Sequence, residues 1–279
     1  MPELLVENLH IRYPSRTGWQ SVVNGVSFQL GTERLGIVGK SGSGKSMTAK
    51  ALMGLVPSPG LVSANRLTLD GTDLLSLSPK AWRAWRGRQI SMVMQDPKHA
   101  LNPVQKVGVQ IAEAGLLHGA LTRSQARMQV LSLLQSVGVQ DPERVADCYP
   151  HQLSGGLGQR VMIAAMLMAS PTLLIADEPT SALDAMVRSQ VLDVMDAEIR
   201  RRGMGLLLIS HDLGMVARYC DRVLIMYRGQ IVEECVASQL HQARHPYTRG
   251  LLACQPSAAR RGQLLPVLDR SQLPEAMSA

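Results

Sequence analysis

One short stretch of the sequence combines the residue types that hold a phosphate group. It reads Gly39, Lys40, Ser41, Gly42, Ser43, Gly44, Lys45 and Ser46. Its glycines allow a tight turn that points backbone N–H groups at phosphate oxygens, and a following helix would add the positive end of its dipole. Lys45 can reach the β- and γ-phosphates, and the Ser46 hydroxyl can bind Mg²⁺. We therefore predict that residues 39–46, the phosphate loop, bind a nucleotide through Gly39, Ser41, Gly42, Ser43, Gly44, Lys45 and Ser46.

Two adjacent carboxylates, Asp177 and Glu178, form the second chemically capable group. Four apolar residues, 173–176, precede the pair and Pro179 follows it, which predicts a buried strand that delivers both carboxylates at its end. Asp177 can bind Mg²⁺, and Glu178 can orient or deprotonate an attacking water. The simpler alternative is an acidic strand end at the surface, which the apolar run before the pair disfavours.

The elements that must position these groups follow an α/β pattern. We predict strands at 4–13, 21–30, 34–38, 65–70, 89–94, 173–176, 205–209, 222–226 and 230–234, and helices at 46–55, 185–201 and 212–219. A helix between successive strands implies a mainly parallel sheet, whereas the turn at Arg228-Gly229 predicts an antiparallel final strand.

The middle of the chain changes character and becomes helical. We predict helices at 107–117 and 123–136, and Thr122 with Gln125 forms a capping box at the start of the second. The expected organisation is an α/β core of residues 1–95 and 160–244, a helical subdomain of residues 96–159 inserted into it, and a C-terminal tail of residues 245–279.

Composition limits the possible classes of protein. Hydrophobic residues make up 46% of the 279 residues, enough for a core, and the formal net charge is +7. The start of the chain lacks the pattern of a secretory signal, and the longest uncharged apolar stretch, residues 161–176, is too short to cross a bilayer. The basic stretch from Lys80 to Lys106 fits a nucleic-acid groove less well than a face toward nucleotide, lipid or a partner, since no aromatic residues interleave after Trp85.

A third motif separates one family from other phosphate-loop proteins. The stretch 153–159, Leu-Ser-Gly-Gly-Leu-Gly-Gln, resembles the LSGGQ signature of ATP-binding cassette (ABC) ATPases, except at Leu157 and Gly158. Further motifs resemble the family in its order. They are Tyr13 as the adenine-stacking aromatic, Gln95 of the Q-loop, Ser181-Ala182-Leu183-Asp184 of the D-loop and His211 as the switch histidine. The resemblance implies a RecA-like P-loop fold with an N-terminal antiparallel β part.

The resemblance also implies roles for these residues. Ser154, Gly155 and Gly156 would form a second anion site that closes on the nucleotide of a partner subunit. The catalytic set would be Glu178, His211, Gln95 and Lys45, and Mg²⁺ would be held by Ser46, Gln95 and Asp177. Trp19 is also near enough in the sequence to replace Tyr13 as the adenine platform.

Local matches narrow the branch of the family. Gln95-Asp96-Pro97, Tyr149-Pro150-His151-Gln152 and His245-Pro246-Tyr247-Thr248 resemble ATPase subunits of bacterial peptide and nickel importers. Peptide-type relatives usually carry a longer tail with clustered cysteines for an iron–sulfur centre, but only Cys254 follows here. On that ground we expect no such centre, and we place nickel or a metal chelate slightly ahead of peptides as the solute.

The resemblance therefore implies an ATP-binding and ATP-hydrolysing subunit of an importer, using ATP and Mg²⁺. Its expected partners are a second ABC ATPase subunit, two membrane permeases and, indirectly, an extracytoplasmic solute-binding protein, with the chain peripheral to the cytoplasmic face of the cell membrane. A soluble ABC ATPase acting on nucleic acid or ribosomes is the alternative, although the chain lacks the second cassette, coiled coil or zinc-bearing insertion usual there. A catalytically dead regulatory cassette is disfavoured by the presence of Lys45, Asp177, Glu178 and His211.

Overall fold

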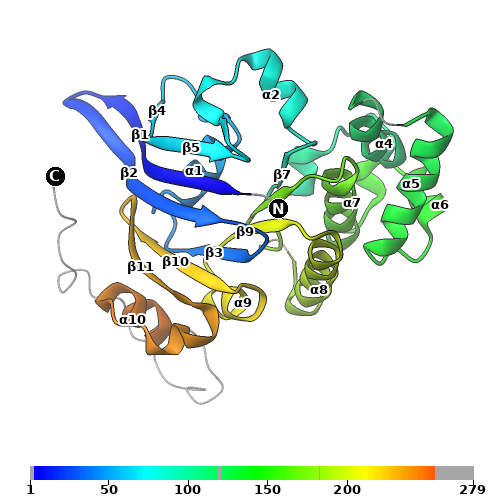
Figure 1. The fold of residues 1–279 in the computed structure, drawn as a ribbon. Helices are drawn as coiled ribbons and strands as arrows, with labels where there is room; N and C mark the ends of the chain where they lie inside the picture. The colour runs from blue at the N-terminus through cyan, green and yellow to red at the C-terminus, as the bar shows by residue number, and fades with distance from the viewer. Residues whose placement is uncertain (1–2, 119–120, 182, 255–279) are drawn as a thin grey trace.

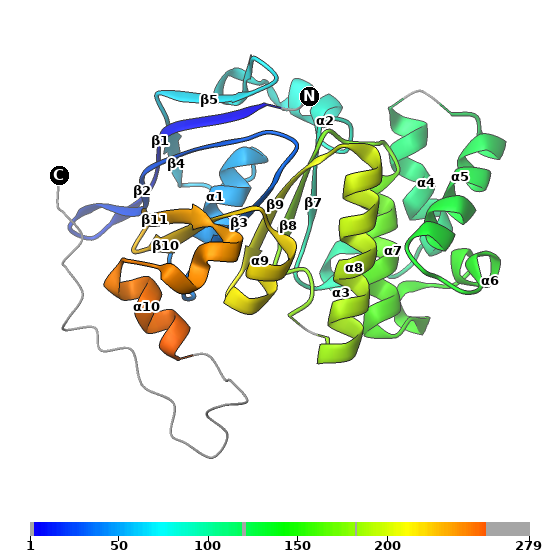
Figure 2. The same cartoon turned by 60° about the horizontal axis from the view of Figure 1, so that its bottom comes forward.

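The computed structural model describes residues 3–118, 121–181 and 183–254, and its strands form two sheets (Figure 1). A group of helices lies at the side of the molecule opposite the hairpin of the first two strands, as both Figure 1 and Figure 2 show. Within the described residues, no helix combines the length and the apolar character needed to cross a bilayer.

The first sheet is antiparallel and is built around β1. Its strands are β1 (Leu4–Ser15), β2 (Gly18–Leu30), β4 (Leu61–Ser63), β5 (Arg66–Leu69) and β6 (Thr72–Asp73). The order is β2-β1-β5-β6, and β4 also pairs with β1. Val6 and Leu9 are both buried although they are three residues apart, because the register of β1 shifts between them. This irregularity keeps the apolar side chains on one face of the sheet.

The second sheet carries the ends of the strands from which the predicted site is built. Its order is β11-β10-β3-β9-β8-β7. The strands are β3 (Arg34–Val38), β7 (Ile90–Val93), β8 (Leu173–Asp177), β9 (Gly205–Ser210), β10 (Arg222–Tyr227) and β11 (Gln230–Val236). All neighbours are parallel except β11, which is antiparallel to β10 as predicted. Because parallel strands end at one edge, the residues after β3, β8 and β9 come together there.

The second sheet separates two hydrophobic cores. Along β9, Leu206 and Leu208 face one core whereas Leu207 and Ile209 face the other, which is the alternation of a strand buried on both faces. The first core joins the sheet to the inserted helices and to α8 (Ala185–Arg202). The second joins it to the antiparallel sheet and to α1 (Lys45–Leu52).

The remaining helices belong to three groups. Near the antiparallel sheet lie η1 (Leu74–Ser76) and α2 (Pro79–Trp85). Between β7 and β8 the helices are α3 (Pro97–Ala100), α4 (Val107–Leu117), α5 (Arg123–Ser136), α6 (Pro142–Ala146), η2 (Pro150–Gln152) and α7 (Gly155–Leu167). Around β10 and β11 lie α9 (Leu213–Tyr219), η3 (Ala237–Gln242) and α10 (Pro246–Ala253).

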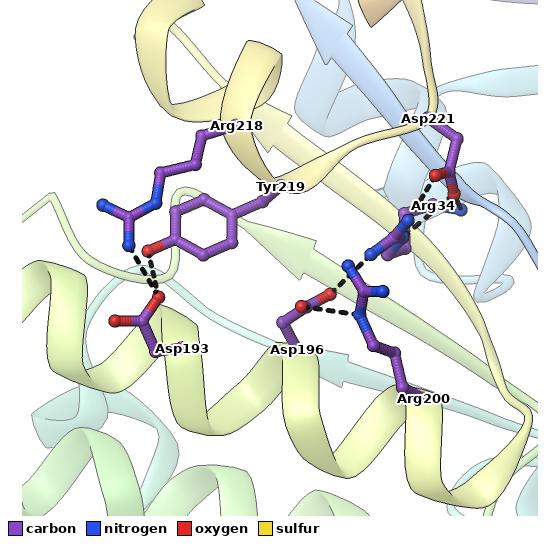
Figure 3. A network of polar contacts seen from close by, with 7 residues as sticks. All are labelled: Arg34, Asp193, Asp196, Arg200, Arg218, Tyr219 and Asp221. Atoms are coloured by element: carbon purple, nitrogen blue, oxygen red, sulfur yellow. Dashed lines mark hydrogen bonds and ion pairs between the residues drawn. The ribbon is translucent and has the colours of Figure 1, made fainter.

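A polar network ties α8 to the second sheet (Figure 3). Arg34 at the start of β3 pairs with Asp196 of α8 through a 3.0 Å contact and also pairs with Asp221 before β10. The hydrogen bond from Arg34 holds the pKa of Asp221 below its ordinary value. Asp196 also accepts a 2.8 Å hydrogen bond from Arg200 one turn along the helix. The network fixes α8, whose first residues follow the predicted D-loop.

Several predicted elements need correction. The helix expected at 46–55 ends at Leu52, because Gly54 adopts a φ of 60° and turns the chain away. The helices α2 and α6 were not predicted, although each begins with a capping side chain and a proline. The predicted domain boundary between residues 159 and 160 falls inside α7. Residues 255–279 of the expected tail lie outside the described residues, as does Ala182 of the expected D-loop.

Candidate nucleotide-binding site

The phosphate loop borders a cavity of about 1030 Å³ at the edge where the parallel strands end. Predicted site residues line it from four segments of the chain: Ser41, Gly42, Gly44, Lys45, Ser46, Gln95, Glu178 and His211. Val22, Met47, Leu251 and Cys254 contribute to its wall and were not predicted. The cavity is large enough for a nucleotide, since ligand pockets commonly enclose about 300–1,000 Å³.

Close packing explains why glycine occupies particular positions of the loop. Gly44 has a φ of 105° as it begins α1, and a Cβ atom there would lie 2.8 Å from the carbonyl oxygen of Val22. A Cβ atom on Gly39 would lie 2.2 Å from the carbonyl oxygen of Met226. Any larger residue at either position would push the loop away from the neighbouring strands.

Lys45 is held inside the loop by backbone carbonyls. Its Nζ donates to the carbonyl oxygens of Gly39 at 2.7 Å and of Lys40 at 3.1 Å. Burial lowers the pKa of Lys45, while the nearby charges of Glu178 and Asp177 oppose that shift. The ammonium group therefore lies at the floor of the cavity, in a place where the negative charge of a phosphate would stabilise it.

Asp177 and Ser46 meet beside the cavity. The Ser46 hydroxyl donates to Oδ1 of Asp177 at 3.0 Å, from the start of α1 to the end of β8. Burial raises the pKa of Asp177, and the Ser46 hydrogen bond opposes the shift. Together with Gln95 they offer oxygen atoms of the kind that Mg²⁺ prefers, and a divalent cation would offset the cost of burying the carboxylate. These residues thus fit a magnesium ion.

Glu178 and His211 form a pair across neighbouring strands. Nδ1 of His211 lies 3.0 Å from Oε2 of Glu178. The backbone N–H of Glu178 donates to the carbonyl oxygen of Ile209, and Glu178 has a φ of 48°, a region that residues other than glycine seldom adopt. The backbone therefore turns the carboxylate toward the cavity, where the pair can hold and deprotonate a water molecule.

The signature stretch lies at other cavities. Ser154 caps α7 by accepting the N–H of Leu157 at 3.4 Å. With Gly155 and Gly156 it lines a separate cavity of about 580 Å³, shared with the start of α8. None of these three predicted residues lines the 1030 Å³ cavity. Gln95 links the two regions, because it also lines a small cavity of about 190 Å³ with Ser154 and Gly155.

The two aromatic residues predicted to stack on adenine do not line the cavity. The Tyr13 hydroxyl donates to the carbonyl oxygen of Pro57 at 3.2 Å, and its ring packs against Gly60. Trp19, near the tip of the β1–β2 hairpin, is 54% exposed. The apolar wall comes instead from residues such as Val22 of β2 and Leu251 of α10. No local pattern marks these residues, because they meet only through the tertiary fold.

Two further placements complete the predicted set. Gly39 lies behind the cavity lining, where its carbonyl holds Lys45. Ser43 is buried, and it lines a small cavity of about 170 Å³ with Tyr227 and Tyr247 rather than the large one. In the sequence, Tyr247 belongs to the motif 245–248 that resembles peptide and nickel importers, and no site role is expected for it. In the structure its hydroxyl accepts the backbone N–H of Lys40 in the phosphate loop.

Comparisons with known proteins identify the family of this chain. The family model for ABC transporters matches residues 23–181. The dipeptide transport ATP-binding protein DppD of Haemophilus influenzae is 44% identical, over 93% of this chain and 79% of that protein. The oligopeptide transport ATP-binding protein OppD of Bacillus subtilis is 43% identical, over 93% and 74% respectively.

Solved structures show the same fold. The ATP-binding cassette MJ0796, in a dimeric post-hydrolysis state bound to ADP and Pi, matches with a TM-score of 0.72 and 26% identity over 85% of this chain and 99% of that chain. CbiO1 from Clostridium perfringens, part of the ABC transporter complex cbiONQ, has a TM-score of 0.72 and 27% identity over 86% and 90%. With a family match over residues 23–181 and relatives above 40% identity, this chain belongs to the ABC transporter family and is an ABC-type ATPase.

Proposed function

We propose that the chain hydrolyses ATP in the 1030 Å³ cavity and thereby drives a peptide importer as its ATP-binding subunit. The observation that carries the proposal is the convergence of Lys45, the Ser46–Asp177 contact and the Glu178–His211 pair at one strand edge. These are a cation for phosphate, oxygen ligands for a metal ion and a base for water.

The residues of the chain divide the work of hydrolysis. The N–H groups of the phosphate loop bind the phosphates, and Lys45 exchanges the carbonyl oxygens of Gly39 and Lys40 for phosphate oxygens. Glu178 accepts a proton from the attacking water, and His211 fixes the carboxylate through the 3.0 Å contact. Gln95 lines both the large cavity and the cavity beside Ser154, which supports a role for it in sensing the γ-phosphate.

Mg²⁺ accompanies ATP in this proposal. Ser46, Gln95 and Asp177 would hold it, and when bound it supplies positive charge that offsets the charge of the phosphates. The raised pKa of the partly buried Asp177 supports a cation at this position, because a positive charge would favour the ionised carboxylate.

A second ABC subunit is the proposed partner at the signature stretch. Ser154, Gly155 and Gly156 line a cavity apart from the chain's own phosphate loop, which supports a role at the nucleotide of another molecule. Two permeases and an extracytoplasmic solute-binding protein would complete the importer, with this chain peripheral to the cytoplasmic face of the membrane. The dimeric cassette among its structural neighbours supports such pairing.

Peptides are the proposed solute class. The relatives named above are described as dipeptide and oligopeptide transport proteins, and nickel does not occur in their names. The order expected from the sequence, with nickel or a metal chelate ahead of peptides, is therefore reversed in this proposal. The soluble alternative acting on nucleic acid or ribosomes gains no supporting observation.

Uptake in a deletion strain tests the proposal. Cells lacking the gene would be complemented with the wild-type chain or with Glu178→Gln, and uptake of labelled dipeptide, labelled oligopeptide and radioactive nickel would be measured. We expect only the wild-type chain to restore peptide uptake, with nickel accumulation equal in all strains. Restored nickel uptake with unchanged peptide uptake would reject the peptide assignment. Restoration of uptake by Glu178→Gln would reject the site.

A further inference from the structure

Tyr247 joins the C-terminal helix α10 to the phosphate loop. Its side chain is fully buried, and the backbone N–H of Lys40 donates to its hydroxyl oxygen at 3.0 Å. Its ring packs against Tyr227 at the end of β10, with 4.3 Å between the ring centroids. A side chain 207 residues further along the chain thus satisfies a backbone donor of the loop that faces the nucleotide cavity.

The Lys40 N–H belongs to the same peptide group as the Gly39 carbonyl, and that carbonyl holds Lys45. Nζ of Lys45 donates to the Gly39 oxygen at 2.7 Å, while the N–H on the other side of this planar group donates to Tyr247. Rotation of the peptide group would break both contacts at once. Tyr247 and Lys45 therefore fix the two ends of a single peptide unit in the phosphate loop.

The chain before Tyr247 is anchored in a way that fixes where its hydroxyl lies. Oε1 of Glu233 on β11 accepts the backbone N–H groups of Arg244 at 2.6 Å and His245 at 3.3 Å. Nδ1 of His245 then caps α10 by accepting the N–H of Tyr247 at 3.2 Å, and Pro246 begins the helix. In Figures 1 and 2, α10 lies beside β10 and β11.

The same helix also borders the cavity directly. Leu251, one turn beyond Tyr247, and Cys254 at the end of α10 both contribute to the lining of the 1030 Å³ cavity. The contact from Tyr247 to the loop is therefore part of a wider approach of α10 to the nucleotide cavity. A packing role alone would require the tyrosine ring, but it would not require a hydroxyl directed at a loop N–H.

We propose that Tyr247 is a positioning residue for ATP binding: its hydroxyl fixes the Gly39–Lys40 peptide and so keeps the phosphate loop in the conformation that receives phosphates. The inference rests on the assignment of ATP to this loop under the proposed function. Without the hydroxyl, the loop must lose additional conformational freedom when ATP binds, which weakens affinity. Lys45 and Glu178 keep their own chemistry, so the step after binding is unaffected.

The test is Tyr247→Phe in the full-length protein assembled with its transporter partners. Removal of one hydroxyl leaves the ring and its packing on Tyr227 in place. We expect KM for ATP, and the dissociation constant for radiolabelled ATP, to rise about fivefold to thirtyfold, while kcat stays within about twofold of the wild type. A merely structural role would lower the thermal midpoint and leave KM unchanged.

Tyr219→Phe is the matched control. The Tyr219 hydroxyl also makes a part-buried hydrogen bond, to Oδ1 of Asp193 at 2.7 Å (Figure 3), but Tyr219 does not line the nucleotide cavity. This variant should lower the thermal midpoint at least as much as Tyr247→Phe and leave KM for ATP unchanged. An equal rise of KM in both variants would overturn the proposal, as would an unchanged KM in Tyr247→Phe.

Lys45→Ala separates failure of this inference from failure of the site itself. If Lys45→Ala binds ATP like the wild type, the loop is not the phosphate site and the proposed function is wrong. If Lys45→Ala binds ATP weakly while Tyr247→Phe binds it normally, the site stands and only the role of Tyr247 is rejected. Weak binding in both variants, with normal binding in Tyr219→Phe, supports the inference.

Discussion

The phosphate loop and the signature stretch differ in how far the chain itself satisfies their side chains. At the loop, Lys45 is held by two carbonyls and Ser46 contacts Asp177 at 3.0 Å, so groups of the chain itself hold these side chains in place. At the signature stretch, the contact of the Ser154 hydroxyl within the described residues is a capping bond of 3.4 Å from the N–H of Leu157. In the phosphate loop, other groups of the chain hold the polar side chains. In the signature stretch, the N-terminus of α7 offers N–H groups that an external anion can bind.

This difference suggests a division between binding and turnover. Variants at the loop and its neighbours should change how this molecule binds and hydrolyses its own ATP. Variants at the signature stretch should leave binding by the isolated chain intact and reduce only the turnover that requires a second subunit. The following predictions test this comparison, beginning with the variant for which we expect the largest effect.

Glu178→Gln should bind Mg-ATP but lose nearly all turnover. In the wild type, Nδ1 of His211 lies 3.0 Å from the carboxylate. The amide of the variant can still hydrogen-bond to Nδ1, but it cannot accept a proton from water. We expect the rate to fall about 10²- to 10⁴-fold, as for the removal of other general bases. Steady-state ATPase assays and equilibrium ATP binding would measure the two quantities. Near-normal turnover would exclude Glu178 as the base.

Gly156→Ala should destabilise the protein, whereas Gly155→Ala should not. A Cβ atom on Gly156 would lie 2.5 Å from Cγ1 of Val187 on α8, which forces α7 and α8 apart. On Gly155 the nearest atom, Cδ2 of Leu183, is 3.4 Å away, an ordinary contact. We expect a loss of about 1–3 kcal/mol for Gly156→Ala and less than about 0.5 kcal/mol for Gly155→Ala.

Denaturant unfolding of both glycine variants would measure these losses. ATP binding by the isolated Gly155→Ala chain should match the wild type, because this stretch does not line the chain's own nucleotide cavity. If Gly155→Ala impaired ATP binding by the isolated chain, the division between the two regions would be wrong.

Asp177→Asn should stabilise the ATP-free protein at neutral pH. Burial raises the pKa of Asp177, so its carboxyl contributes stability below its ordinary pKa of 3.8 and loses that contribution as pH rises through the folded-state value. Replacing the partly buried charge should raise the thermal midpoint at pH 7 by about 2–4 °C, and the gain should shrink on acidification below pH 4. Thermal unfolding of both proteins across a range of pH, without nucleotide, would measure the two midpoints. A midpoint at pH 7 lower than that of the wild type would contradict the prediction.

The local part of this structure was predictable from the sequence, because its signals lie in neighbouring residues. The helices Val107–Leu117 and Arg123–Ser136 and the strand Arg34–Val38 occur at their predicted bounds. The capping box of Thr122 and Gln125 is also present. Even the missed α2 carried a signal, because Ser78 caps it and Pro79 occupies its first position.

The non-local part of the site could not be predicted in the same way. The position of the Tyr13 side chain depends on its hydrogen bond to the carbonyl oxygen of Pro57. No sequence pattern near Tyr13 indicates this contact. The role of Tyr247 likewise depends on the packing of α10 against Tyr227. The sequence indicates which strand ends carry the chemically active residues. It does not show which distant segments of the chain pack against those strand ends.

Ser154→Ala and Thr122→Ala provide the finest test of the comparison, because both remove the cap of a helix. Thr122 belongs to a full capping box, in which its hydroxyl accepts the N–H of Gln125 at 3.3 Å and its own N–H donates to the Gln125 side chain at 2.8 Å. Among the described residues, Ser154 accepts the 3.4 Å bond from the N–H of Leu157 and no second capping bond. Loss of a cap costs about 0.5–2 kcal/mol, and we expect Thr122→Ala to fall near the middle of that range and Ser154→Ala at its lower end.

If Ser154 serves mainly to cap its own helix, its removal should cost stability and leave ATPase activity of the assembled transporter unchanged, as we expect for Thr122→Ala. If its hydroxyl instead faces a partner's nucleotide, the variant that loses more stability in denaturant unfolding should be the one that loses less ATPase activity. Ser154→Ala would then be the milder variant in denaturant unfolding and the more severe one in ATPase activity. We expect this reversal, because a hydroxyl with so weak a contact on its own chain retains most of its capacity to bind an incoming phosphate.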